Sequence, residues 1–102
     1  MLFLVQLLYM KTWRTPKFKK FAKALLLIES QKDMENFLRD VATLEELDAL
    51  SSRWEVAQMI DKGIAYRTIA EKTGVSTATI TRIAHWLRHG EGGYQATLDT
   101  SH

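Results

Sequence analysis

The chain has 102 residues, of which 46% are hydrophobic and 25% charged, close to the averages of a single globular domain. It has no cysteine, which excludes disulfide frameworks, thiolate metal sites and cysteine nucleophiles. One proline and five glycines are too few for the many turns of an all-β protein. The composition therefore favours an all-α fold.

The net charge of +2 hides a strong segregation of charge along the chain. Residues 11–23 carry six bases and no acid, residues 24–61 carry three bases and nine acids, and residues 62–90 carry five bases and one acid. Such blocks give separate surfaces opposite potentials, and the positive surfaces attract polyanions. The first basic block has two interpretations, an arm that contacts phosphates or a solvated helix.

Residues 1–14 are expected to form an N-terminal extension. The apolar run of residues 1–10 lacks the charged segment and the cleavage site of a signal peptide, and it is too short to span a bilayer as a helix. It is either a short helix buried against a partner or an upstream extension of a chain that starts at Met10. In both cases we expect a cytoplasmic protein with no membrane partner.

Helical periodicity and capping signals predict five helices from Thr15 onward. The first three begin at the capping residues Thr15, Ser30 and Thr43, and Gly63 ends the third. Their apolar faces are too extensive for a chain of this size to cover alone. We therefore expect residues 15–63 to form the helical dimerisation region of a homodimer.

Residues 64–90 have the spacing of a helix-turn-helix, and residues 91–102 are expected to form a C-terminal tail. Ala70 is small where the two helices approach, Gly74 allows the positive φ of the turn, and Ser76 can cap the second helix. The predicted shared core consists of Ile69, Val75, Ile80, Ile83, Ala84 and Leu87.

The opposite face of the second helix is hydroxylated and cationic and has no carboxylate, which is typical of a helix that enters the major groove. Arg82 is expected to bind guanine, while Arg67 and Lys72 contact the phosphate backbone. Thr77 and Thr81 are expected to contact phosphates, bases or a thymine methyl group. The predicted DNA-contacting residues are Arg67, Lys72, Ser76, Thr77, Ala78, Thr79, Thr81, Arg82 and His85.

A wider set of motifs lies between Leu38 and Leu98. It comprises residues 43–46, Leu50, Arg53, Gly63 and residues 74–76, 78–82, 93–94 and 96–99. In this combination the chain resembles the Trp repressor superfamily, and within it the YerC/YecD branch. The resemblance implies an all-helical array with a C-terminal helix-turn-helix, an intertwined homodimer, and a bacterial transcription regulator that is nucleoid-associated when bound.

The resemblance also implies a possible ligand site, because the Trp repressor holds an indole amino acid between its long helix and its reading helix. Thr43, Arg53 and Arg82 match ligand-contacting positions. However, the residue after Arg82 is glycine in the repressor and Ile83 here, and the loop after Gly63 is one residue shorter. Since a branched side chain takes the ligand's space, we expect no L-tryptophan cofactor. The alternative role of Arg53 is an ion pair with a helix carboxylate.

Other functions find little support. His85 and His89 have the i, i+4 spacing of metal ligands, but no third ligand is apparent, so we expect no metal site. The aromatic residues are not clustered, which argues against RNA, and no phosphate loop or nucleophile motif indicates an enzyme. The sequence favours a homodimeric regulator of double-stranded DNA, most simply a repressor. The alternatives are a protein-interaction adaptor that uses the same hairpin and an amino-acid-gated sensor.

Overall fold

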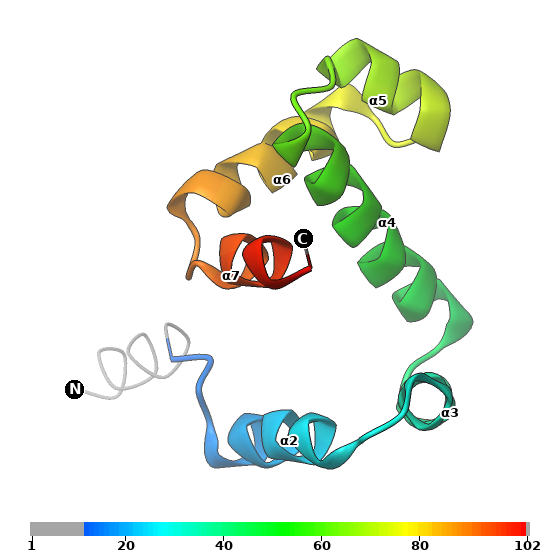
Figure 1. Cartoon of the computed structure of the whole chain (residues 1–102), viewed down its shortest axis with the longest axis vertical. Coiled ribbons are helices and arrows are strands. Elements are labelled where there is room, and N and C mark those ends of the chain that lie inside the picture. Colours follow the sequence, from blue (N-terminus) through cyan, green and yellow to red (C-terminus); the bar gives the residue numbers. More distant parts are fainter. Residues whose placement is uncertain (1–11, 102) are drawn as a thin grey trace, which may run out of the picture. The chain divides into compact units, whose positions relative to one another are not determined.

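The computed structural model describes residues 12–101, and every regular element among them is a helix (Figure 1). The helices are α2 (Pro16–Leu27), α3 (Gln31–Val41), α4 (Leu44–Asp61), α5 (Tyr66–Thr73), α6 (Thr77–His89) and α7 (Gly93–Thr100). The predicted all-α fold is confirmed. The interpretations of residues 1–10 lie outside the described residues. None of the helices within residues 12–101 is both long and apolar enough to cross a bilayer.

The prediction of five helices from Thr15 onward is wrong by one, because Gly93–Thr100 also forms a helix. This helix, α7, has no side-chain cap at its start, so the sequence gives no strong signal for it. Tertiary packing stabilises it instead: α7 contacts α4 and α6, and its Leu98 is only 1% exposed.

The chain divides into two compact units between Val41 and Ala42. We call α2 and α3 the N-terminal unit, and α4 to α7 the C-terminal unit. This division differs from the expected boundary at residue 63. The reason is that Val56 and Ala57 of α4 are buried in the same core as residues of α5 and α6.

The N-terminal unit begins its helices at the predicted capping residues. The Thr15 hydroxyl accepts a hydrogen bond of 3.1 Å from the Phe18 backbone N–H, and Pro16 takes the first helical position. The Ser30 hydroxyl accepts one of 3.1 Å from the N–H of Asp33. The two helices have no buried residue. The two helices of this unit therefore have well-formed N-terminal caps but no buried core.

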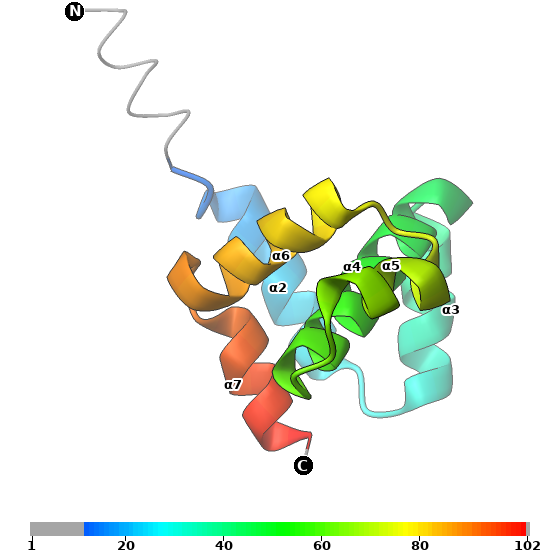
Figure 2. The ribbon, with the colours of Figure 1, turned by 90° about the horizontal axis from the view of Figure 1, so that it is seen from above.

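The C-terminal unit has a compact core of Val56, Ala57, Ile69, Ile80 and Ile83. Helix α4 contacts α5, α6 and α7, and α6 also contacts α5 and α7. Seen from above, α7 turns back from the end of α6 (Figure 2). The predicted left-handed residue at the end of α4 is confirmed, since Gly63 has a φ of 78°. This packing holds α6 at the surface of the unit with one side buried.

Candidate nucleic-acid interface

The turn between α5 and α6 is closed by short-range hydrogen bonds. Gly74 has a φ of 75°, as predicted, and its backbone N–H donates to the Ala70 carbonyl at 2.9 Å. The Thr73 hydroxyl donates to the Ile69 carbonyl at 2.7 Å and accepts from the Val75 N–H at 3.1 Å. These bonds satisfy the last turn of α5 and fix the direction in which α6 leaves it.

Helix α6 begins at Ser76, whose hydroxyl accepts a hydrogen bond of 3.2 Å from the Thr79 backbone N–H. Three of the four residues predicted for the inner side are buried, since Ile80, Ile83 and Ala84 are at most 2% exposed, and the fourth, Leu87, is half-buried. The opposite side of the same helix is therefore turned to solvent. We call this side the outer face of α6, and it consists of Thr77, Ala78, Thr81, Arg82, His85 and His89, all exposed.

Of the residues predicted to contact DNA, all are exposed except Thr79, which is half-buried. The Thr79 hydroxyl accepts a hydrogen bond of 3.0 Å from the Ser76 hydroxyl. The Thr81 hydroxyl donates to the Thr77 carbonyl at 2.9 Å. Thr79 thus belongs to the cap of α6, a role that sequence reasoning missed because threonine is not the Glu or Gln of a usual capping box.

Helices α5 and α6 expose more basic than acidic side chains, with Glu71 of α5 as the one carboxylate of Tyr66–Thr73 and Thr77–His89. Arg82 and Arg88 are the permanently charged side chains of α6, which has no carboxylate anywhere in Thr77–His89. Helix α5 adds exposed Arg67 and Lys72. The N-terminal end of α6 contributes the positive end of its helix dipole, so charge and dipole both favour an anionic partner here.

The structure does not bring the proposed ligand residues into contact. The Thr43 hydroxyl accepts from the Glu46 N–H at 3.0 Å, and the Glu46 carboxylate accepts from the Thr43 N–H at 2.9 Å. These two bonds form the predicted capping box, and the bond from the Thr43 backbone lowers the pKa of Glu46. Among the described residues, no hydrogen bond or ring contact joins Thr43, Arg53 and Arg82.

Arg53 has an aromatic neighbour that the sequence analysis did not predict. Its guanidinium carbon lies 5.9 Å from the centroid of the Trp86 ring, so the side chains of α4 and α6 form a cation–π pair. The charge of Arg53 also acts on Tyr94 of α7, whose pKa is nevertheless raised because burial dominates. No sequence signal at i, i+4 spacing could have found this contact, because it joins residues far apart in the chain.

Ile83 lies in the core of the C-terminal unit at 1% exposure. Its side chain packs in the core cluster with residues of α4, α5 and α6, in space that a glycine would leave open. The expectation that it excludes a ligand stays a prediction. The two histidines of α6, His85 and His89, lie with ring centroids 5.0 Å apart. No group of three potential metal ligands occurs among residues 12–101.

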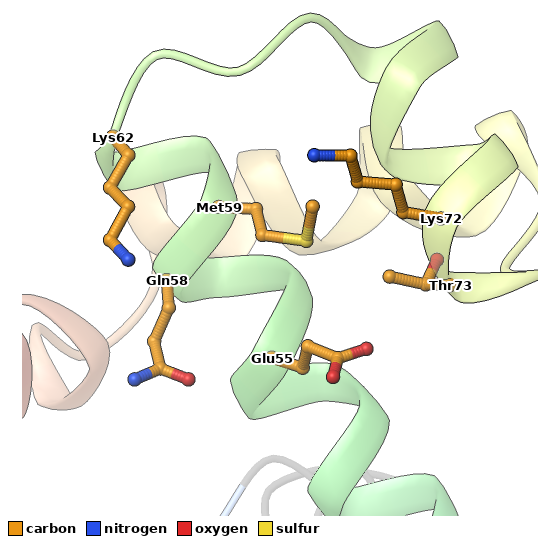
Figure 3. A pocket seen from close by; sticks show the side chains of 6 residues that line it. All are labelled: Glu55, Gln58, Met59, Lys62, Lys72 and Thr73. Atoms are coloured by element: carbon orange, nitrogen blue, oxygen red, sulfur yellow. The ribbon is translucent and has the colours of Figure 1, made fainter.

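Two open clefts lie on the C-terminal unit, and neither was predicted. A cleft of about 340 Å³ lies between α4 and α5, where Lys72 and Thr73 face Met59 and its neighbours on α4 (Figure 3). Its other lining residues are Glu55, Gln58 and Lys62. A second cleft of about 290 Å³ is lined by Glu46, Ala49, Leu50 and Arg53 of α4. Both are shallow surface features rather than enclosed ligand sites.

Comparisons with known proteins agree with this arrangement. Residues 16–102 match the family described as Trp repressor protein. The chain is 41% identical over 75 residues to the uncharacterized protein YerC of Bacillus subtilis (strain 168). The matched segment covers 71% of this chain and 72% of YerC.

Two solved structures have the same fold. A TrpR-like protein of Eubacterium eligens gives a TM-score of 0.81 at 37% identity, covering 85% of this chain and 90% of that one. A Trp repressor-like protein of Staphylococcus aureus also gives a TM-score of 0.81, at 35% identity, covering 86% and 88% of the two chains. Fold, helix-turn-helix and sequence thus agree, and the chain belongs to the Trp repressor family.

Proposed function

We propose that this protein is a homodimeric transcription regulator that binds double-stranded DNA through α6 and acts as a repressor. The observation that carries the proposal is the two-sided character of α6. Its apolar side is buried in the core, while its outer face is exposed, hydroxylated and cationic and has no carboxylate. A helix held in this way can enter the major groove with its N-terminal residues at the base edges.

Individual roles follow from the position of each side chain. Arg82, exposed in the middle of α6, can bind guanine through two hydrogen bonds. Thr77 and Ala78 lie in the first turn of α6, where helix-turn-helix proteins contact bases. Arg67 and Lys72 belong to α5, which crosses the backbone in such complexes, and they are assigned to phosphates.

Dimerisation is supported by the apolar surface that one chain leaves uncovered. The exposed large hydrophobic residues are Trp13, Phe18, Phe21, Leu26, Leu27, Val41, Leu44, Leu50 and Trp86. Most of them lie on α2 and on the N-terminal half of α4, which fits a dimer built from the helices before the hairpin. A two-fold dimer presents two copies of α6 to successive major grooves, roughly 34 Å apart.

DNA binding that depends on an amino-acid effector has less support than DNA binding without one. Ile83 fills the core beside α4, and the guanidinium of Arg53 already lies over the indole ring of Trp86. Of the three site residues implied by the resemblance, Arg53 contacts Trp86 and Thr43 caps α4, so two of them already have partners within the chain. We assign no cofactor to the regulator.

The test is a selection of bound fragments from random duplex DNA. We expect a two-fold-symmetric sequence to emerge, with half-sites about 10 base pairs apart from centre to centre. The affinity for that sequence should fall steeply with salt, because several phosphate contacts release counterions. If no sequence is enriched and binding to all duplexes is equally weak, the proposal is wrong, and the protein-interaction adaptor and the amino-acid-gated sensor remain as the alternatives.

A further inference from the structure

Helix α6 carries two histidines one turn apart on its outer face, His85 and His89. Both side chains are exposed, and their ring centroids lie 5.0 Å apart. Residues at i and i+4 lie on the same side of a helix, so both rings border the same solvent. Neither imidazole has a hydrogen bond or an ion pair with another side chain among residues 12–101. Each neutral ring therefore keeps a nitrogen lone pair for a ligand from outside the chain.

The distance between the rings is the one that two imidazoles have when they bind the same metal ion. Imidazole nitrogens coordinate zinc at about 2.1 Å, which places the centroids of two rings on one ion about 5 Å apart when the angle between the bonds is near tetrahedral. The ring planes are tilted by 46° in this structure. Because the second side-chain torsion of histidine is broad, both rings can turn to aim one nitrogen at a common ion. Helix α6 thus already holds the two ligands at the distance that chelation needs.

The types of side chain decide which ions can bind. Imidazole nitrogen suits Zn²⁺, Ni²⁺ and Cu²⁺, whereas Mg²⁺ and Ca²⁺ prefer oxygen ligands. Helix α6 has no carboxylate within Thr77–His89, and the sequence has no cysteine. No third ligand was expected from the sequence, and no group of three occurs among residues 12–101. The pair can therefore hold a transition-metal ion only in an open site, whose other positions are left to water or to a ligand from another molecule.

Two arginines lie within one turn of the histidine pair. Arg82 precedes His85 by three residues, and Arg88 is next to His89. Their positive charges oppose a further cation and lower its affinity, but all four side chains are exposed, so water and salt screen the repulsion. Once an ion is bound, the same arginines favour an anion as its next ligand. An anionic oxygen from a partner is therefore the ligand that best completes the site.

We propose that His85 and His89 bind a divalent transition-metal ion, Zn²⁺, Ni²⁺ or Cu²⁺, and that this ion binds a phosphate of the DNA that α6 contacts. The second part rests on the proposed function. Thr77 and Ala78, in the first turn of α6, are assigned to bases, whereas the histidines lie in its C-terminal half, where a helix in the major groove comes out toward the phosphate backbone. The ion brings two positive charges to that backbone and takes a phosphate oxygen as a ligand. Since the chain supplies only two ligands, the ion is exchangeable and is not a resident cofactor.

The first experiment measures metal binding in the absence of DNA. Isothermal titration calorimetry with ZnCl₂ and NiCl₂ is carried out on the full chain without a histidine tag. We expect one ion per chain and a dissociation constant in the micromolar range, because two ligands bind more weakly than the four of a structural zinc site. His85→Ala and His89→Ala should each weaken binding by about tenfold or more, because a single imidazole cannot chelate. MgCl₂ should give no binding.

The sequence supplies a matched control for these variants. It has three histidines, and the third, His102, lies outside the pair. His102→Ala removes the same side chain and should bind Zn²⁺ like the parent. Circular dichroism checks that each variant keeps its helices, which we expect because His85 and His89 are exposed. Zinc binding that neither pair variant weakens, or that His102→Ala weakens as much as they do, overturns the proposed site.

The second experiment measures the affinity for the selected operator with ZnCl₂ and with EDTA. Zinc should tighten the binding of the parent on the order of tenfold, and the operator should raise the affinity for zinc by the same factor, because the two binding equilibria are linked. His89→Ala should bind the operator equally with and without zinc. The readout is the ratio of two affinities of one protein, so a direct contact of either histidine with DNA cancels.

The two experiments fail in different ways. If zinc binds the pair but leaves the affinity for the operator unchanged or lowers it, the contact of the ion with a phosphate is wrong. If the titrations show no chelation by the pair, the whole inference is wrong although DNA binding stands. The proposed function fails by another result, a random-duplex selection that enriches no sequence, and the titration without DNA still decides the metal site.

Discussion

The two units of this chain use their apolar residues in opposite ways. In the C-terminal unit, residues from α4, α5 and α6 meet in a core whose members are almost fully buried. In the N-terminal unit no residue is buried, and Leu26 of α2 is 84% exposed. An amphipathic helix therefore indicates a surface that must be covered, but it does not say which molecule covers it. One unit has a buried core of its own, and the other leaves its largest apolar side chains exposed.

The largest effect that separates the two units is the loss of a core side chain. Ile80→Ala should destabilise the protein by about 2–5 kcal/mol, because Ile80 is fully buried and its truncation leaves a cavity. Leu26→Ala should change the free energy of unfolding by less than about 0.5 kcal/mol at concentrations that favour the monomer. Urea denaturation followed by circular dichroism measures both.

A second measurement tests the contrast between the two units further: the effect of Leu26→Ala on the free energy of unfolding over a range of protein concentrations. If a second copy covers α2, the destabilisation caused by this variant should grow as the dimer becomes populated. Equal and large effects of Ile80→Ala and Leu26→Ala in the monomer would contradict the contrast between the units.

The next largest effect is a loss of DNA affinity, which we expect from substitutions in the C-terminal unit. Arg82→Ala should weaken binding to the selected operator by about 1–3 kcal/mol and relax the preference at a single base position. Lys72→Ala should weaken binding to all sequences evenly and reduce the salt slope by about one. Competition binding against single-base variants of the operator distinguishes the two. An Arg82→Ala protein that binds every operator like the parent would remove Arg82 from the base contacts.

How much of this could be read from the sequence depends on the range of each interaction. The capping box of Thr43 and Glu46, the positive φ of Gly74 and the cap at Ser76 were all predicted, because each depends on residues within four positions. The outer face of α6 also follows from a local rule, since a helix repeats every 3.6 residues.

Features that depend on contacts between distant residues were missed. Helix α7 has no side-chain cap and is stabilised by the burial of Leu98, so no local sequence signal predicts it. The proximity of Arg53 and Trp86 and the cleft between α4 and α5 depend on how the helices cross. For the same reason, the compact division at Val41 could not be read from periodicity alone.

A smaller effect tests the start of α4, where the C-terminal unit begins. Thr43→Ala should cost about 1 kcal/mol, because it removes the side-chain acceptor for the Glu46 N–H. The variant should keep most of the pH dependence of the parent, because the backbone N–H of residue 43 still donates to the Glu46 carboxylate. The pKa of Glu46 is lowered in the folded protein, chiefly by the bond from the Thr43 backbone.

The sign of that pH dependence follows from proton linkage. The stabilisation is fully present above the unfolded pKa of 4.5 and is lost as the pH falls through the lower folded pKa. Thermal melts of the parent and of Glu46→Gln between pH 3 and pH 6 should therefore differ most at the upper end of this range. Parallel curves for the two proteins would contradict the contribution of the Glu46 carboxylate.

The smallest predicted effect is the coupling between Arg53 and Trp86, which joins α4 to α6 within the C-terminal unit. A double-mutant cycle with Arg53→Met and Trp86→Leu should give a coupling energy of about 0.5–1 kcal/mol, the range of cation–π pairs at exposed sites. Trp86→Phe should retain part of it, because an aromatic face remains, whereas Trp86→Leu keeps only apolar bulk. A coupling of zero would mean that the position of α6 depends on the buried isoleucines alone. A coupling in the predicted range would show that an exposed contact between α4 and α6 also helps to fix the position of α6.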